Sequence, residues 1–256
     1  MLCAAVLPRL SPPRKRGAVS YGDVTSANVV GYQLIAVPSG FSLFAPTFKG
    51  VGQNLDLSTI DVCNADGSIN TEIYGGVMIQ LMNVKGGYTD MYAYDKDSYP
   101  ENGWQGTDGK EISVGQVTFA DGAAFCVNND YGETVYIRIS GEVDLINRNE
   151  VSTGFVLGGN ATPVAFDLSK LNVVDADGNI NTEIYGGVMI QLMNAKGGYT
   201  DMYAYDKDSY PNNGWQGPDG SEIKVGDLVL EPGQAVCINN DYGETVWMNP
   251  PCPIKK

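Results

Sequence analysis

The feature that most constrains the fold of this chain is an internal repeat with a period of 111 residues. The segment TEIYGGVMIQLMNVKGGYTDMYAYDKDSYP begins at Thr71 and recurs from Thr182, with Ala195 in place of Val84 as the single change. The same offset continues on both sides without insertions, so the two copies are expected to share one fold. A period of this length corresponds to a whole domain rather than to one unit of a solenoid.

Extending the match outward divides the 256 residues into two domains and two tails. The opening has a short apolar run before its basic cluster, which is the reverse of a signal peptide, although Ala18-Val19-Ser20 suits a cleavage site. We interpret it either as a damaged, truncated or misassigned export leader or as a flexible tail. The expected boundaries are 1–20 for this segment, 28–138 for the first repeat, 139–249 for the second and 250–256 for the C-terminal tail.

Within each copy, short β-rich runs such as VVGYQLIAV, GFSLFAPTF and EIYGGVMIQLMN are separated by Gly, Asn, Asp and Pro. No amphipathic helix interrupts them, apart from one turn expected at 57–60 and another at 168–171. Short strands at this spacing predict an all-β fold of two tandem homologous β-sandwich-like domains, with a small barrel as the alternative. Apolar alternation in GGVMIQLMN places these residues in the two cores: Val77, Ile79, Leu81, Val188, Ile190 and Leu192.

The charge balance argues against two classes of partner. The chain has 16 basic and 30 acidic residues, for a net charge of −14, and six of the basic residues lie in the tails. The remaining surface therefore repels phosphate backbones and anionic lipid, so nucleic acid is not an expected partner. No stretch approaches the roughly 20 consecutive apolar residues of a transmembrane helix.

The chain contains no histidine, which removes the commonest general base and the Ser-His and Cys-His nucleophile pairs. Of the five cysteines, only Cys126 and Cys237 correspond between the copies, and each is expected to be a buried thiol in a strand. No close cysteine pair suits zinc. Two carboxylates in a cleft would allow glycoside hydrolysis, but acidic residues are scattered throughout, so we do not expect an enzyme. The residues available by type are Glu72, Asp95, Asp97, Glu183, Asp206 and Asp208.

Aromatic residues gather in the segment GGYTDMYAYDKDSYPENGWQG. Two-residue alternation along a strand would place Tyr88, Tyr92 and Tyr94 on one face. Such rings beside carboxylates and amides stack on sugars, but tyrosines also fill a half-buried strand face. Both interpretations stay open. The glycan-binding interpretation assigns Tyr92, Tyr94, Tyr99, Trp104, Tyr203, Tyr205, Tyr210 and Trp215.

Oxygen-bearing side chains alternate in the loop DADGNINTE, which starts at Asp175, and in its counterpart from Asn64. Alternation of this kind is typical of calcium loops, although the spacing of a 12-residue calcium loop is absent. Asp-Gly between apolar runs also predicts a hairpin turn, so both interpretations stay open. The calcium interpretation, which supplies the only cofactor considered, assigns Asp66, Asn70, Asp175, Asp177, Asn179 and Asn181.

Several short motifs carry a resemblance to a known group. The chain contains TSANVVGYQLIAVPSGFSLFAPTF, NGWQG, LEPGQAVCINN, YIRISGEV and STGFVLGG. It resembles repeat-bearing exported bacterial proteins with the motif order VGY, P-x-GF-x-L, GW, L-x-PGQ-x-F and GEV. The resemblance covers nearly all of 25–240, and it implies an exported all-β protein without adding an activity or catalytic residues. The first copy departs from the motifs at 120–122, where ADG replaces the EPG of 231–233.

These observations favour a non-catalytic, secreted or cell-surface protein whose tandem β-domains are structural or adhesive modules. A glycan-binding module and a calcium-stabilised spacer are the alternatives, and a glycan or another surface protein is the expected partner. Prolines after Asn249 cut the final strand short, because proline has no N–H for a ladder. The edge of the second repeat is therefore a candidate surface for self-association.

Overall fold

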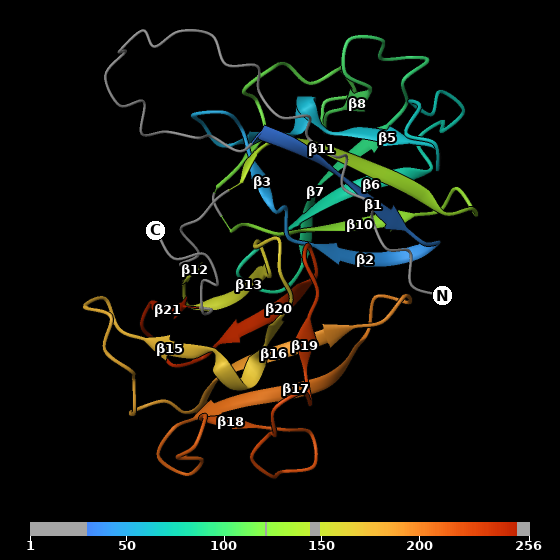
Figure 1. Ribbon diagram of the computed structural model, residues 1–256. Coiled ribbons are helices and arrows are strands. Elements are labelled where there is room, and N and C mark those ends of the chain that lie inside the picture. The colour runs from blue at the N-terminus through green and yellow to red at the C-terminus, as the bar shows by residue number, and fades with distance from the viewer. Residues whose placement is uncertain (1–29, 121, 144–148, 250–256) are drawn as a thin grey trace, which may run out of the picture.

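Antiparallel strands joined by turns and loops make up almost all of the regular secondary structure in the computed structural model, which describes residues 30–120, 122–143 and 149–249 (Figure 1). Within these ranges the helical segments are two 3-10 turns, η1 (Leu57–Thr59) and η2 (Leu168–Lys170). Each turn is capped by the aspartate before it, whose carboxylate accepts a hydrogen bond from the backbone N–H two residues later. The all-β prediction and the two expected turns are confirmed.

The first half of the chain forms two main sheets and one small one. Its four-stranded sheet contains β1 (Val30–Val37), β11 (Val135–Val143), β3 (Phe48–Lys49) and β5 (Asp61–Cys63). Its five-stranded sheet has the order β2 (Gly40–Phe44), β10 (Phe125–Asn129), β6 (Val77–Met82), β7 (Tyr88–Tyr94) and β8 (Trp104–Gln105). The small sheet pairs β4 (Leu55–Asp56) with β9 (Thr118–Phe119).

The second half repeats this plan. Its three-stranded sheet has the order β12 (Asn149–Val151), β21 (Val246–Asn249) and β15 (Asn172–Val174). Its five-stranded sheet has the order β13 (Gly154–Gly159), β20 (Ala235–Asn240), β16 (Tyr185–Met193), β17 (Tyr199–Asp206) and β18 (Trp215–Gln216). The small sheet pairs β14 (Phe166–Asp167) with β19 (Val229–Leu230). Among the described strands, no sheet combines strands of both halves.

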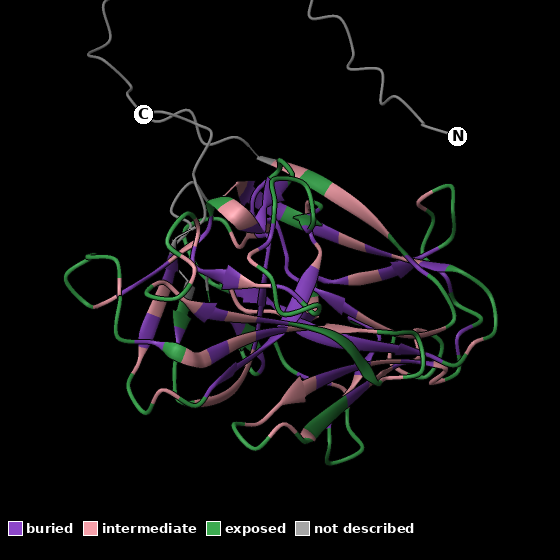
Figure 2. Ribbon diagram, turned by 90° about the horizontal axis from the view of Figure 1, so that it is seen from below, coloured by how far each residue is buried: buried purple, intermediate pink, exposed green. Residues whose placement is uncertain are grey.

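Each half encloses its own hydrophobic core. The first core collects inward side chains of both main sheets of the first half, among them Ile79 of β6 and Ile137 of β11. The expected core positions Val77, Ile79 and Leu81 belong to this core, and their counterparts belong to the second. Figure 2 shows buried residues along the strands and exposed residues in the loops. The apolar alternation of the sequence therefore identified the inner face of this strand correctly.

A third apolar cluster joins the halves, and no feature of the sequence had suggested it. Its buried members come from both five-stranded sheets and the residues beside them: Leu43, Ala45, Cys126, Leu157, Ala235 and Cys237. The two five-stranded sheets therefore meet on the sides that face away from their own cores. The four larger sheets follow one another around the molecule like the blades of a four-bladed propeller (Figure 1).

The first half extends further along the chain than expected. Strand β11 passes through the expected boundary at 138 and ends at Val143, because Glu142 and Val143 still pair with β3. The second half is described from Asn149. The expected leader at 1–20 and the tail at 250–256 lie outside the described residues.

The last strand of the second half is described to Asn249, and the expected stop of pairing after this residue lies outside the described residues. Strand β21 is nevertheless central in its sheet, with β12 on one side and β15 on the other. Self-association through this region stays a prediction.

Candidate functional site

The aromatic residues expected to bind sugars lie in the hydrophobic core. Tyr94 and Trp104 are 0% exposed, and their rings meet edge to face with centroids 5.0 Å apart. The indole Nε1–H of Trp104 donates to the carbonyl oxygen of Ile60 at 2.7 Å. Tyr92 is 9% exposed and belongs to the same core. These rings fill the domain interior and present no face to a ligand.

The second half repeats this arrangement. Tyr205 and Trp215 are 0% exposed with ring centroids 5.0 Å apart, and Tyr203 is buried beside them. The indole N–H of Trp215 donates to the carbonyl oxygen of Leu171 at 2.9 Å. The indole N–H of each buried tryptophan thus has a backbone acceptor, which is the usual arrangement for a core indole. The burial of these six rings argues against their stacking on a glycan.

The two remaining residues of the glycan set, Tyr99 and Tyr210, are half-buried and hold loops together. Their hydroxyls donate to the carbonyl oxygens of Gly109 at 3.1 Å and Gly220 at 3.0 Å. A glutamine amide of β8 or β18 donates to each hydroxyl in turn. The polar atoms that would contact a sugar are thus engaged within the loops.

A β-bulge explains why strand alternation failed on β7. Tyr92 pairs with the inward Ile79, but the register shifts between Gln80 and Met82, and Tyr88 pairs with Met82. The shift turns Tyr88 away from the core and toward the other half, where it joins the third cluster. Tyr88, which alternation groups with Tyr92 and Tyr94, therefore packs in the third cluster, between the halves.

The first acidic loop is a hairpin turn. Cys63 and Ile69 bridge across its base, and the backbone N–H of Asn64 donates to Ser68 at 2.8 Å. The carboxylate of Asp66 accepts hydrogen bonds from the N–H of Ser68 at 2.9 Å and from its hydroxyl at 2.6 Å. These bonds hold the pKa of Asp66 below its usual value.

The side-chain oxygen and nitrogen of Asn70 also form hydrogen bonds within this loop. Its side-chain oxygen accepts from the N–H of Glu72 at 2.9 Å, and its Nδ2 donates to Asn64 at 2.9 Å. The side chain is 7% exposed. The amide therefore closes the hairpin from inside.

The second acidic loop is built in the same way, with a bridge between Val174 and Ile180. The carboxylate of Asp175 accepts from the backbone and side chain of Asn179 at 2.8 and 3.2 Å. Asn181 accepts from the N–H of Glu183 at 2.9 Å, and Asp177 is exposed. In the described part of the chain, no three acidic, cysteine or histidine side chains converge as metal ligands.

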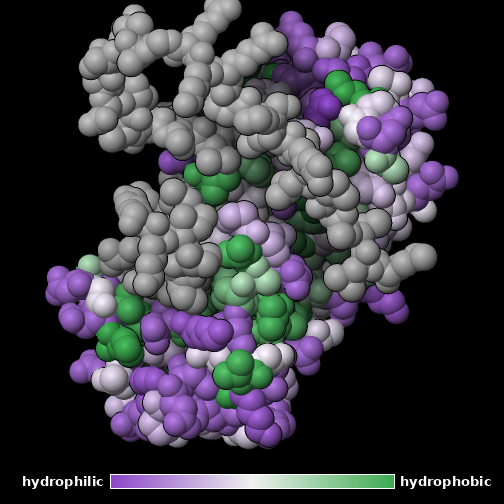
Figure 3. Space-filling view, in the orientation of Figure 1, coloured by the Kyte–Doolittle hydropathy of each residue, from purple (hydrophilic) through white to green (hydrophobic). Residues whose placement is uncertain are grey.

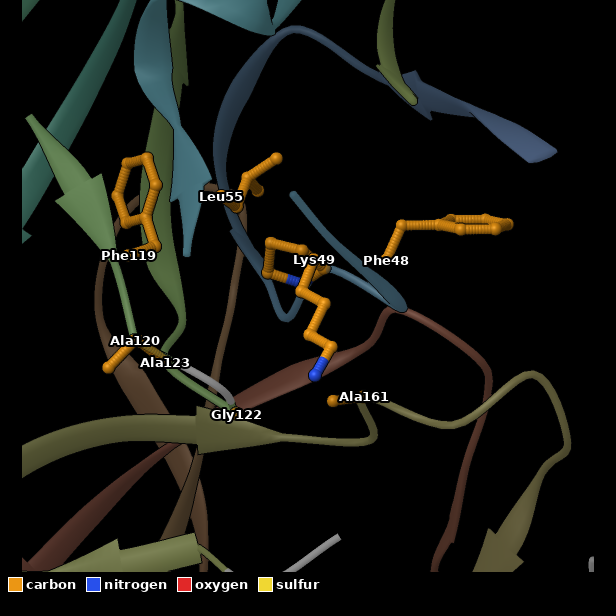
Figure 4. Close-up of a pocket in the computed structure, with 9 residues that line it drawn as sticks. Phe48, Lys49, Leu55, Phe119, Ala120, Gly122, Ala123 and Ala161 are labelled. Atoms are coloured by element: carbon orange, nitrogen blue, oxygen red, sulfur yellow. The ribbon is translucent and has the colours of Figure 1, made fainter. Parts of the chain in front are cut away.

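The carboxylates available by type for catalysis lie in separate loops of the two halves. Asp95 and Asp206 accept from backbone N–H groups of their own loops at 3.0 and 2.9 Å, while Asp97 and Asp208 are exposed. Glu72 lines a polar cleft of about 380 Å³ together with Tyr131. The cavity in Figure 4, between the first half and Ala161 of the second, holds only about 10 Å³, room for about one water molecule.

The two halves meet at a junction, the interface formed by the third cluster and the residues beside it. The N–H of Phe41 on β2 donates to the carbonyl oxygen of Ala195 at 3.0 Å. The N–H of Phe155 on β13 donates to the carbonyl oxygen of Val84, also at 3.0 Å. Val84 and Ala195 are equivalent positions of the repeat, so the same contact is made twice in opposite directions.

Glycines on both sides of the junction allow this close approach. Gly40 and Gly154 precede the two phenylalanines and have φ angles of +98° and +95°. A Cβ on Gly40 would lie 2.4 Å from the carbonyl oxygen of Ala195, and one on Gly154 would lie 2.4 Å from that of Val84. Any side chain at either position would therefore push the halves apart.

Sulfur atoms and phenols occupy the centre of the junction. The hydroxyl of Tyr88 lies 3.6 Å from Sδ of Met193, and Sγ of Cys237 lies 3.9 Å from Sδ of Met82. Burial raises the pKa of Tyr88, and it raises the pKa of Cys126 to about 11. The predicted burial of the repeated thiols is confirmed, because both are fully buried free cysteines. Neutral, apolar groups thus fill this interface.

Apolar side chains gather on the visible surface around the region where the halves meet (Figure 3). A cleft of about 490 Å³ lies there, lined by residues of both halves that include Ala123 and Val156. On β2, Phe41 and Leu43 pack in the third cluster, whereas Phe44 of the same strand packs in the first core. A strand that is apolar on both faces indicates a second buried surface.

Comparison with protein-family models, with curated proteins and with solved structures finds no match for the chain. Neither of the helical turns in the described ranges is long and apolar enough to cross a membrane.

Proposed function

We propose that the chain is a non-catalytic structural protein of the cell surface or the extracellular space. In this proposal two tandem copies of one β-sandwich-like domain form a single stiff unit. The observation that carries it is the reciprocal junction, in which Phe41 and Phe155 make the same main-chain hydrogen bond at 3.0 Å in opposite directions. Contacts made twice resist rotation of one half against the other better than a single contact.

The side chains that would otherwise suggest a ligand are used to build the fold. Trp104 and Trp215 lie in the two cores, and the oxygens of Asp66, Asn70 and Asp175 hold hairpin turns. Intramolecular use of these groups favours a structural role over the glycan alternative. It also favours rigid loops over loops that need calcium to become ordered.

The proposed location rests on composition and resemblance. A net charge of −14 keeps a protein soluble and discourages binding to anionic lipid, and the motif order resembles exported repeat proteins. The experiment is to label intact cells that express the full chain with a membrane-impermeant amine reagent and then quantify labelled lysines such as Lys110 and Lys224. We expect labelling equal to that of the purified protein. Labelling only after the cells are broken would contradict an external location.

A further inference from the structure

The faces that meet at the junction belong to equivalent positions of the two halves. Leu43 and Cys126 from the first half correspond to Leu157 and Cys237 from the second, and all four are buried in the one cluster. An interface in which the same patch is used on both sides is isologous, the kind of contact that relates identical subunits of a two-fold dimer. The face of one half is thus shaped to fit another copy of the same domain.

The contacts across the junction do not depend on the two halves belonging to one chain. The two reciprocal hydrogen bonds each join a main-chain N–H of one half to a main-chain carbonyl of the other, and each phenylalanine ring rests on a glycine of the facing loop. A Cβ on Gly197 would lie 3.3 Å from the ring of Phe41, and one on Gly86 would lie 3.1 Å from the ring of Phe155. The first half of one molecule therefore fits the second half of another through the same contacts.

We propose that two copies of this chain exchange halves and form a closed dimer with two junctions. Each junction in the dimer joins the first half of one chain to the second half of the other. Because both faces of each chain are then occupied, this assembly stops at two. The inference rests on the junction used in the proposed function and adds a partner, a second copy of this chain.

Local concentration decides between the closed monomer and the exchanged dimer. Two modules joined by a short linker experience each other at an effective concentration on the order of millimolar. The monomer is therefore favoured in dilute solution, and exchange is favoured where chains are crowded or where the junction within one chain is damaged. Chains are crowded at a cell surface, and the junction within one chain is damaged in the paired variants described next.

The test uses two full-length variants, Gly40→Ala and Gly154→Ala. Each adds a methyl group that would lie 2.4 Å from a backbone oxygen of the opposite half, so each variant alone has no intact junction. In a mixed dimer, the first half of the Gly154→Ala chain meets the second half of the Gly40→Ala chain, and this junction is wild type. We expect the mixture at roughly 100 µM to give a dimer of twice the 27.4 kDa chain mass. The amount of dimer should be roughly tenfold higher than in either variant alone, which corresponds to a difference of about 1.4 kcal/mol in the free energy of association.

Matched controls separate the junction from local backbone strain. Gly67→Ala and Gly178→Ala also place a side chain at positive φ, +83° and +87°, but with open space around the new Cβ. Mixing these two should give no dimer. If the alanine variants at Gly40 and Gly154 fail to fold, Phe41→Ala and Phe155→Ala make the complementary pair without a change at glycine.

Native mass spectrometry of differently isotope-labelled chains identifies the mixed dimer. Alkylation of Cys126 and Cys237, read by peptide mass mapping, reports whether the junction is open in each variant alone. Open junctions with no mixed dimer would overturn the exchange and leave the proposed function standing. Thiols that stay protected in both variants would overturn the junction itself, and with it both the proposed function and the exchange.

Discussion

The backbone N–H of Phe41 lies 3.0 Å from the carbonyl oxygen of Ala195, a residue of the opposite half of the chain. The glycine before Phe41 has no room for a Cβ against that same oxygen. The contact therefore depends on backbone groups and on the absence of a side chain. Its mirror, between Phe155 and Val84, gives the substitutions that test the junction.

Gly154→Ala should open the junction while leaving both cores intact. The new Cβ would lie 2.4 Å from the carbonyl oxygen of Val84, whereas the control Gly178→Ala has the same kind of φ and no atom within 4 Å. We expect alkylation of Cys126 and Cys237 to accelerate in the first variant alone. Equal protection of these thiols in both variants would mean that the halves do not pack in this way.

Trp104→Phe should lower the unfolding free energy of the first half. The substitution leaves the carbonyl oxygen of Ile60 buried without its donor, which costs about 1–3 kcal/mol. The control Tyr32→Ala removes a ring that is 71% exposed and should change the unfolding free energy by less than about 0.5 kcal/mol. Urea denaturation measures both, and equal effects would argue against the buried position of Trp104.

Calcium should leave the melting temperature unchanged, because the loop oxygens already accept hydrogen bonds within their turns. Asp66→Ala should lower the melting temperature to the same extent in calcium and in chelator, since it removes the two bonds from Ser68. Differential scanning calorimetry in both buffers gives the comparison. A calcium-dependent rise that Asp177→Ala abolishes would restore the calcium interpretation.

Alkaline pH should weaken the junction. Burial raises the pKa of Cys126 to about 11 from an ordinary value of 9.0, and it raises those of Tyr88 and Tyr199 as well. A group whose folded pKa is raised contributes stability below its unfolded pKa, and that contribution is lost as pH rises from about 9 to about 11. The difference in unfolding free energy between wild type and Cys126→Ala should therefore shrink across this range. A difference that stays constant from pH 8 to 11 would show that the thiol is not desolvated.

The sequence was sufficient for the strands, the two cores and the two 3-10 turns. The reason is that branched apolar residues recur at every second position of GGVMIQLMN, at Val77, Ile79 and Leu81, and turn residues bound each run. It was not sufficient for the role of Tyr92 and Tyr94, because alternation says which residues share a face but not which face is inward. The bulge beside Met82 then moved Tyr88 to the opposite side, and a bulge of this kind has no clear sequence signature.

The junction was missed for a different physical reason. Phe41 and Leu43 read as ordinary strand residues, and only the pairing of β2 with β10, which places Leu43 opposite Cys126, defines the second buried surface. Contacts between faces that lie far apart in the chain depend on how the sheets are placed. The near identity of the copies suggested two separate domains, whereas it also made a symmetric interface possible.

If the two halves form one stiff unit, the distance between their far ends is fixed and can be measured. Strands β8 and β18 lie at opposite ends of the molecule (Figure 1), and spin labels at the exposed positions Lys110 and Ser221 beside them report that distance by double electron–electron resonance. We expect one narrow distance distribution, which broadens with Gly154→Ala and not with Gly178→Ala. A broad distribution in the wild-type chain would show that the two halves move independently.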